Sequence, residues 1–230
     1  MIRTAILGAS GYVGGEVLRL LAVHPKLRAT KLFGESKAGR PVAETHPHLA
    51  PVYAGSFEKF DESALADVDL VFAALPHGHS QAIAPAILRR GIPFVDLGAD
   101  FRLDDAATYE RWYGQAHEAP ALLGEFVYGI PELNRAAIRG AKAVAAAGCY
   151  ATAAILALKP LVDSGHVNPS SLIVDAASGV SGAGRDAKEA TGFSTVDGNF
   201  AAYGLINHRH TAEMEMALEA TVLFTPHLVR

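Results

Sequence analysis

The sequence IRTAIL at residues 2–7 runs directly into GASGYVG at residues 8–14, and this stretch decides the fold. The first segment, apolar at most positions, is typical of a strand buried on both faces of a parallel sheet. Glycines at positions 8, 11 and 14 form G-x-x-G-x-x-G, a variant of the dinucleotide fingerprint, ahead of an apolar helical pattern. Such a turn lets the backbone approach a pyrophosphate at the helix N-terminus. The stretch predicts a dinucleotide site, with a ligand-free glycine turn as the alternative.

Further apolar runs alternate with helical patterns along the chain. We expect strands over residues 28–33, 69–75, 91–97 and 142–146. Strands that alternate with helices of this length predict a doubly wound parallel sheet of the Rossmann type, and hence an α/β fold class. In such a sheet the loops at the carboxyl ends of the strands line one ligand crevice. The loops expected on that side are residues 8–14, 75–80, 98–102 and 148–149.

The loop after the second expected strand bears on the choice between NAD and NADP. Glu35 can accept a hydrogen bond from a ribose 2′-hydroxyl, whereas Ser36, Lys37 and Arg40 can hold a 2′-phosphate. Three donors against one acid favour NADP, and a solvated charged loop is the alternative. The residues expected to bind the cofactor are Gly8, Ser10, Gly11, Tyr12, Val13, Ser36, Lys37, Arg40, Leu75, Pro76, His77, Ser181 and Gly182.

The only cysteine of the 230 residues lies in AAAGCYAT at residues 145–152, between an expected strand and an expected helix. The free N–H groups of a helix N-terminus favour a thiolate over a thiol. A small buried hydrophobe is the alternative for a lone cysteine. The parallel-sheet rule places Cys149 on the side of the expected cofactor, which favours a nucleophile for thioester chemistry.

Ten histidines are present, and they include three pairs spaced two residues apart: His46/His48, His77/His79 and His208/His210. A neighbouring imidazole would stabilise the thiolate of Cys149 and exchange protons with the substrate. The pairs also suit a metal-dependent hydrolase in which Cys149 is structural. No carboxylate cluster accompanies the pairs, so we expect no metal, and we expect His46 and His48 to be capping or surface residues. A non-catalytic nucleotide-binding regulator is a third hypothesis.

The bulk composition excludes several classes of protein. A formal charge of −4 and a pI near 6.2 show no basic footprint for nucleic acid. One cysteine excludes a disulfide framework and fits a reducing cytosol. No signal-peptide pattern begins the sequence, and no apolar run is long enough to span a bilayer. We therefore expect a cytoplasmic protein without a membrane partner.

The chain changes character after residue 149. We expect a helix that ends or kinks at Pro160, a strand over residues 171–177, and a helix through Leu218 capped by Thr211. Between the strand and the second helix, the glycine-rich loop SGVSGAGR at residues 178–185 ends in an arginine and suits close approach to a ligand. The helical pattern through Glu219 meets an apolar strand over residues 221–225 without glycine, proline or asparagine, which is unusual.

Seven motifs together resemble N-acetyl-gamma-glutamyl-phosphate reductase, a family of the semialdehyde dehydrogenase superfamily. The motifs are GASGYVG (8–14), LPHGHS (75–80), GADFRL (98–103), GCY (148–150), SGVSGAGR (178–185), HRHT (208–211) and FTPHL (224–228). The resemblance implies NADPH-dependent reduction of N-acetyl-L-glutamyl 5-phosphate to the semialdehyde, with phosphate release, in arginine biosynthesis. It implies Cys149 as the nucleophile and His208 as the acid–base, with His210 left for the substrate.

The same resemblance implies substrate-binding roles and an assembly. Arg102 matches a phosphate-binding arginine of the related aspartate-semialdehyde dehydrogenases, and Gly148 and Arg185 complete the expected substrate-binding set. The implied domains are an NADP-binding domain at residues 1–148 and a catalytic, substrate and dimerisation domain of α+β type at residues 149–230. A dimer or tetramer is the implied assembly.

The chain departs from the family at two places. Members usually read NPGCYPT where this chain has AAGCYAT at residues 146–152, a form that resembles sister reductases of carrier-bound aminoadipyl or glutamyl phosphate. Members also continue well beyond residues 224–227, so we expect a C-terminally shortened second domain whose sheet has exposed edges.

Overall fold

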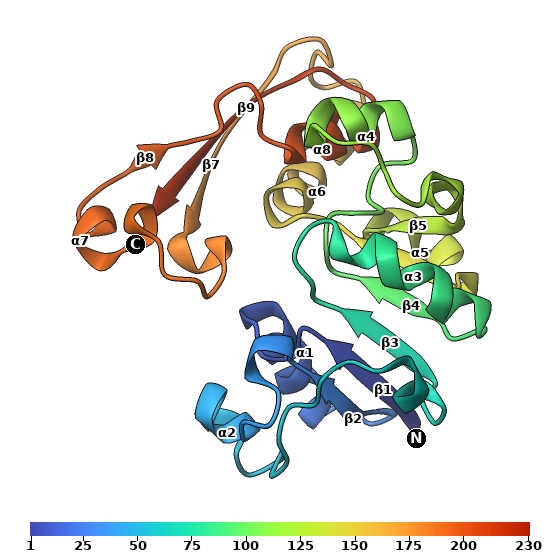
Figure 1. Cartoon of the computed structure of the whole chain (residues 1–230). Helices are drawn as coiled ribbons and strands as arrows, with labels where there is room; N and C mark the ends of the chain where they lie inside the picture. Colours follow the sequence, from blue (N-terminus) through green and yellow to red (C-terminus); the bar gives the residue numbers. More distant parts are fainter.

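The computed structural model describes residues 1–230, and it contains a six-stranded and a three-stranded sheet (Figure 1). The predicted strand–turn–helix is present as β1 (Ile2–Leu7) and α1 (Tyr12–Ala22). β1 is buried on both faces, because Ala5 and Leu7 join one apolar core while Ile6 joins another. This double burial confirms the prediction of a doubly wound α/β sheet.

The six strands of the large sheet are all parallel and lie in the order β2-β1-β3-β4-β6-β5. Their bounds are β2 (Leu27–Phe33), β3 (Leu70–Ala73), β4 (Phe94–Asp96), β5 (Phe126–Gly129) and β6 (Ala143–Ala146). The strand order reverses between β1 and β3, and ligands of doubly wound sheets bind at this point. β5 was not predicted from the sequence; it is a four-residue edge strand that directly follows a 3₁₀ turn.

Helices cover both faces of this sheet (Figure 1). They are α1, α2 (Val42–Thr45), α3 (His79–Arg89) and α5 (Pro131–Gly140), whereas α4 (Ala106–Tyr113) packs against Ala212 and Met216. Pro131 occupies the first turn of α5, where its missing N–H has no helical partner to lose. These helices leave the carboxyl ends of the strands accessible.

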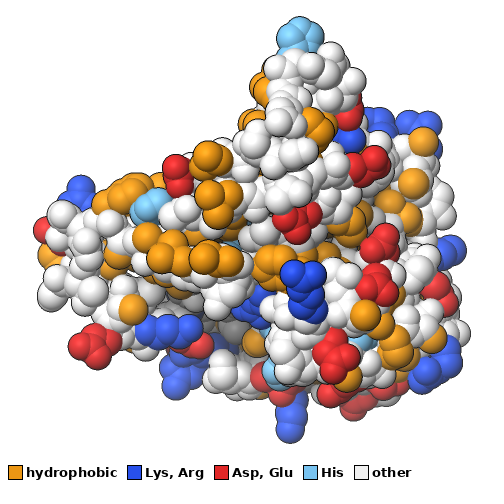
Figure 2. Space-filling model, turned by 90° about the horizontal axis from the view of Figure 1, so that it is seen from above, with side chains coloured by type: hydrophobic (Ala, Val, Ile, Leu, Met, Phe, Trp, Pro, Cys, Tyr) orange, Lys and Arg blue, Asp and Glu red, His pale blue; other side chains and the backbone are white.

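The second sheet packs one face against two helices, α6 (Cys149–Asp163) and α8 (His210–Leu218). It has the order β7-β9-β8, with bounds β7 (Leu172–Gly179), β8 (Ala201–Ala202) and β9 (Val222–Val229), and a short α7 (Phe193–Val196) precedes β8. Leu172, Val222 and Phe224 face the helices, whereas Ile173 and Leu223 are 68% and 53% exposed. Seen from above, the molecule carries several groups of apolar side chains on its surface (Figure 2).

Two local predictions in this region were wrong, and the unusual junction before β9 has a structural explanation. Pro160 neither ends nor visibly interrupts α6, which continues to Asp163; a proline this near the helix end removes one backbone bond only. Thr211 does not cap α8, because the helix begins at His210, whose N–H donates to Nδ1 of His208 at 3.1 Å. The junction into β9 is made by Glu219 in the left-handed conformation, with φ 52°, in place of a glycine.

Candidate active site

The glycine turn after β1 has room for backbone only. Gly8 has φ +75°, and a Cβ at this position would lie 2.2 Å from the carbonyl oxygen of Ala74, at the end of β3. A Cβ at Gly14 would lie 2.3 Å from the carbonyl oxygen of Gly8. The turn therefore keeps a side-chain-free surface at the N-terminus of α1, directly at the switch point of the sheet. This cradle fits a dinucleotide pyrophosphate.

In the loop after β2, Glu35 is bound within the protein, whereas the donors Ser36, Lys37 and Arg40 are not. Glu35 Oε1 accepts a hydrogen bond from the N–H of Phe60 at 2.9 Å, so this carboxylate is engaged within the protein. Ser36 and Arg40 are exposed and Lys37 is half-buried, and neither cation forms an ion pair. The three donors are free to meet a ribose 2′-phosphate.

The loop after β3 is fixed by Asp100. This buried carboxylate accepts hydrogen bonds from the N–H groups of Gly78 (2.7 Å) and Ser80 (2.9 Å) at the start of α3. Nδ1 of His77 lies 2.8 Å from Asp100 Oδ1, and the His77 ring stacks on Tyr113 at 4.5 Å. Burial alone would raise the pKa of Asp100, but His77 and these N–H groups hold it below its ordinary value. Leu75, Pro76 and His77 therefore lie on a rigid loop beside the glycine turn.

Cys149 is the first residue of α6, and it is exposed. The residue before it, Gly148, is buried and caps the helix. A Cβ at Gly148 would lie 2.4 Å from Nε2 of His210, so the imidazole packs directly on this backbone. Tyr150, which follows, donates its hydroxyl proton to the carbonyl oxygen of His227 at 2.8 Å and ties the start of α6 to β9. The thiol is thus held at a helix N-terminus with a histidine behind it.

Glu213 organises the backbone around Cys149, and sequence reasoning did not identify it. Its carboxylate is fully buried and accepts hydrogen bonds from the Gly148 N–H (2.9 Å), the Tyr128 hydroxyl (2.9 Å) and Arg102 Nη1 (3.0 Å). These groups come from the turn before α6, from β5 and from the loop after β4. The only available signal was the position of Glu213, one turn after His210 in α8.

Arg102 is held within the protein. It is only 8% exposed, and Nε donates to the carbonyl oxygen of Ala146 at 2.9 Å while Nη2 donates to that of Leu97 at 3.2 Å. Nη1 pairs with Glu213 and lies 3.4 Å from Nε2 of His210. These bonds make Arg102 a positioning residue for the backbone before Cys149, and its contact with a substrate phosphate stays a prediction.

His208 and His210 lie side by side, with ring centroids 4.8 Å apart. Burial lowers the pKa of both rings to about 4, and the neighbouring charges of Arg209 and Arg102 reinforce the shift at His210. Nδ1 of His208 accepts the N–H of His210, so a neutral His208 carries its proton on Nε2. Nδ1 of His210 is buried without a partner. His208 therefore has a ring nitrogen left for a substrate, whereas both nitrogens of His210 face protein.

The glycine-rich loop of the second domain reaches the first domain. The guanidinium carbon of Arg185 lies 4.4 Å above the ring of Tyr12, the first residue of α1. Ser181 and Gly182, also expected at the cofactor, are exposed on the same loop. Arg185 was expected at the substrate, but the structure places it against the dinucleotide turn.

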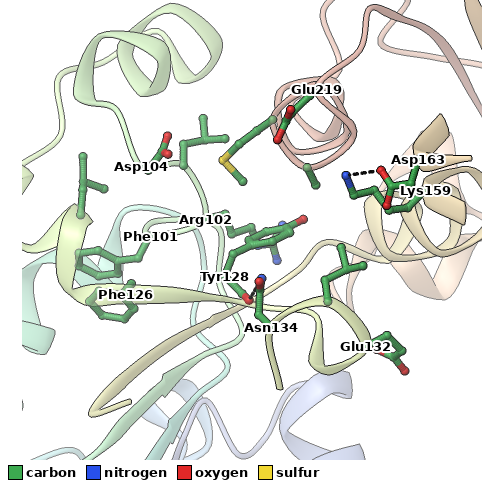
Figure 3. Close-up of a pocket in the computed structure, with 15 residues that line it drawn as sticks. Phe101, Arg102, Asp104, Phe126, Tyr128, Glu132, Asn134, Lys159, Asp163 and Glu219 are labelled. Atoms are coloured by element: carbon green, nitrogen blue, oxygen red, sulfur yellow. Dashed lines mark hydrogen bonds and ion pairs between the residues drawn. The ribbon is translucent and has the colours of Figure 1, made fainter. Parts of the chain in front are cut away.

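A cavity lies behind the Glu213 network. It has a volume of about 590 Å³ and is bounded by Arg102 and Tyr128 in its wall, with Lys159 and Asp163 paired at one side (Figure 3). Cys149, His208 and His210 do not line it. We therefore take the exposed thiol of Cys149, beside His210 and Gly148, and not this cavity, as the candidate reactive centre.

Two further features of the fold concern metal ions and membranes. No group of three or more His, Cys, Asp or Glu side chains is arranged to hold a metal ion. None of the helices has both the length and the apolar character needed to cross a bilayer.

Comparison with protein families divides the chain into two matches. Residues 3–141 match the model of the semialdehyde dehydrogenase NAD-binding domain, and residues 149–230 match that of the semialdehyde dehydrogenase dimerisation domain. The fold is also similar to aspartate semialdehyde dehydrogenase II from Vibrio cholerae, with a TM-score of 0.70 and 19% identity over 100% of this chain and 70% of that one. The NADP complex of aspartate semialdehyde dehydrogenase from Candida albicans gives a TM-score of 0.69 at 16% identity, over 100% of this chain and 68% of that one.

Relatives found by sequence are more similar to this chain than these solved structures are. The chain is 45% identical to N-acetyl-gamma-glutamyl-phosphate reductase from Desulforamulus reducens, over 99% of this chain and 68% of the relative. It is 47% identical to the reductase of the same name from Desulforudis audaxviator, over 100% of this chain and 68% of the relative. The chain thus spans about two thirds of the length of these relatives.

Proposed function

The chain belongs to the N-acetyl-gamma-glutamyl-phosphate reductase family of oxidoreductases, and from this premise we propose that it reduces N-acetyl-L-glutamyl 5-phosphate to N-acetyl-L-glutamate 5-semialdehyde with NADPH. One observation carries the proposal: Cys149 lies exposed at the N-terminus of α6, on the sheet edge that also bears the glycine turn. The reaction releases phosphate and belongs to arginine biosynthesis, in the reducing cytoplasm that a free thiol requires. The named relatives favour this substrate over a carrier-bound acyl phosphate.

Cys149 begins the chemistry by attacking the acyl carbonyl. Its Sγ–C bond forms, the bond from the carbonyl carbon to the phosphate oxygen breaks, and phosphate leaves with its electron pair. The N-terminus of α6 places partial positive charge beside the sulfur, and the neutral ring of His210 packs on the preceding Gly148. When bound, NADPH supplies the hydride that reduces the Cys149 thioester to the aldehyde level.

We assign His208 the proton-donor role in this proposal. Its pKa of about 4 keeps it neutral at pH 7, and with Nδ1 accepting the N–H of His210 it presents Nε2–H as a donor to the oxyanion on the substrate. The proton of the exposed Cys149 thiol passes to water before attack, and after hydride transfer the oxyanion collapses to the aldehyde with the Cys149 thiolate as leaving group. His210 packs on Gly148 and approaches Arg102, and we assign it to shaping the substrate pocket. Tyr203, whose pKa burial and Tyr150 raise above its ordinary value, stays a neutral hydroxyl beside Cys149.

The cofactor and assembly follow from the two domains, which we divide at residues 148 and 149. Engagement of Glu35 by Phe60, with Ser36, Lys37 and Arg40 free, supports NADP over NAD. The match to a dimerisation domain supports a homo-oligomer. We place its contact on the open face of the second sheet, where Ile173 and Leu223 are neighbouring register partners.

The test is the reverse reaction. The protein is incubated with N-acetylglutamate semialdehyde, phosphate and NADP, and the absorbance of NADPH is followed. Wild type should reduce NADP, NAD should serve poorly, and Cys149→Ser should lower the rate by at least about 10³-fold because a hydroxyl is a far weaker nucleophile. Full activity of Cys149→Ser, or none from folded wild type, would refute the assignment.

A further inference from the structure

His46 lies buried behind the dinucleotide turn, although its sequence context indicated a capping or surface residue. It follows α2 and is 2% exposed. Nε2 lies 2.9 Å from the carbonyl oxygen of Ala9, within the glycine turn. Because a carbonyl can only accept, Nε2 carries the proton and donates it. Burial lowers the pKa of His46, which keeps the ring neutral at pH 7 with its single N–H on that bond.

This bond fixes the direction of the peptide that joins Ala9 to Ser10. In a trans peptide the C=O and the following N–H point in opposite directions, and the chain contains no cis bond. The N–H of Ala9 is itself held by the carbonyl oxygen of Phe33 at 2.8 Å. With the Ala9 oxygen drawn towards His46, the Ser10 N–H is turned away from it, and this N–H donates to no protein acceptor. A free N–H just before α1 is a donor for a bound phosphate.

Gly15 makes room for the histidine. A Cβ at this position would lie 2.4 Å from Cε1 of His46, closer than any real contact. The ring also meets Phe57 edge-on at 6.1 Å. The two adjacent glycines of α1 thus have separate purposes, since Gly14 adjoins Gly8 in the turn while Gly15 adjoins the ring that braces it.

We propose that His46 is a positioning residue of the cofactor site, which aims the Ser10 N–H at the dinucleotide pyrophosphate by holding the carbonyl of Ala9. The inference rests on the proposed function for the identity of the cofactor. A residue that directs a phosphate donor alters the affinity for NADPH and leaves the chemistry at Cys149 unchanged.

The experiment compares His46→Phe, which keeps an aromatic ring and loses the donor, with His46→Gln, which keeps a donor. The exposed neighbour His48→Phe is the matched control. The Kd for NADPH is measured by titration calorimetry without substrate, and kcat is measured at saturating NADPH. His46→Phe should weaken NADPH binding roughly three- to tenfold, the worth of one neutral hydrogen bond, and His46→Gln should recover most of the loss. kcat should stay within about twofold of wild type in all three variants, since transition-state contacts are unchanged.

Unchanged affinity in His46→Phe, or an equal loss in His46→Phe and His46→Gln, overturns the inference. If His46→Phe does not fold, Gly15→Ala, which displaces the ring from Ala9, must weaken NADPH binding by a similar factor for the inference to stand. Wild type that binds NADPH but fails in the reductase assay refutes the proposed activity and leaves the His46 comparison valid. Wild type that binds no NADPH refutes both.

Discussion

At the scale of single residues, Glu213 is the group on which most of the site geometry depends. It is buried without solvent contact and joins a backbone N–H, a phenol and a guanidinium that come from three elements. A buried ion pair adds little to stability relative to apolar packing, but removal of one partner leaves an uncompensated charge. Glu213 therefore matters chiefly because it is the one carboxylate that forms an ion pair with Arg102.

We expect Glu213→Gln to lose about 3–5 kcal/mol of unfolding free energy, because the buried charge of Arg102 is left unpaired. Urea unfolding at pH 7 measures the change. The control is Glu16→Gln, which breaks an exposed pair with Arg19 and should cost less than about 0.5 kcal/mol. An unchanged urea midpoint for Glu213→Gln would contradict the buried pair.

The histidine pair predicts a loss of stability in mild acid. His208 and His210 have folded pKa values of about 4, below the ordinary value of 6.5, so the unfolded chain binds more protons between these limits. The contribution of the two neutral rings to the unfolding free energy is complete above pH 6.5 and is lost as the pH falls towards 4. Asp96, whose pKa burial raises to about 6, acts in the opposite direction over much of this range, but it is one group against two.

The measurement is urea unfolding at pH 7.5, 6 and 5. The unfolding free energy should fall with pH, and the double variant His208→Phe/His210→Phe should show a smaller slope. A wild-type curve that is flat between pH 7.5 and 5 would contradict the buried neutral rings.

At the scale of elements, the two ends of α8 and its connection to β9 depend on backbone conformation that the sequence pattern does not reveal. Both ends of this helix depart from the residue types that usually mark helix termini, because Arg209 is the N-cap residue, with the His208 ring accepting the first helical N–H, and Glu219 adopts the left-handed conformation. The sequence predicted α8 and β9 but not the way they connect, since an unusual φ leaves no trace in hydrophobic periodicity. β5 was also missed, because it directly follows a 3₁₀ turn and no apolar run set it apart from that turn.

Glu219→Gly should raise the unfolding free energy by about 0.5–1 kcal/mol, because glycine adopts a left-handed φ without the steric cost that a Cβ brings. Chemical denaturation compares it with Glu110→Gly in α4, where glycine within a helix should cost about 1 kcal/mol. If Glu219→Gly lowers the unfolding free energy, the interactions of the Glu219 carboxylate stabilise the fold by more than its left-handed φ costs.

At the scale of the whole molecule, the two sheets differ in how they are covered. The large sheet is enclosed by helices on both faces, whereas the β7–β9 sheet packs one face on α6 and α8 and exposes the other (Figure 1). Side chains such as Ile173 and Leu223 remain accessible there. An open apolar sheet face of this kind suits self-association, in line with the match to a dimerisation domain.

Ile173→Lys should therefore shift the protein to monomer, because a charge on this face would be desolvated in a symmetric contact. Light scattering coupled to size exclusion measures the mass. Leu20→Lys on α1, an equally exposed apolar position far from this face, is the control and should keep the wild-type mass. If Ile173→Lys keeps the wild-type mass, the contact between subunits does not lie on this face.

The sequence by itself determined the elements whose signals are local. The strand, glycine turn and helix at residues 2–22, the parallel sheet and the place of Cys149 at a helix start all follow from periodicity and turn chemistry over a few residues. Only the tertiary structure decided the partners: Arg102 with Glu213 across 111 positions, His46 with Ala9 across 37, and Arg185 with Tyr12. The physical reason is that a buried polar group must find its partner in three dimensions, and neither spacing nor composition records which distant group supplies it.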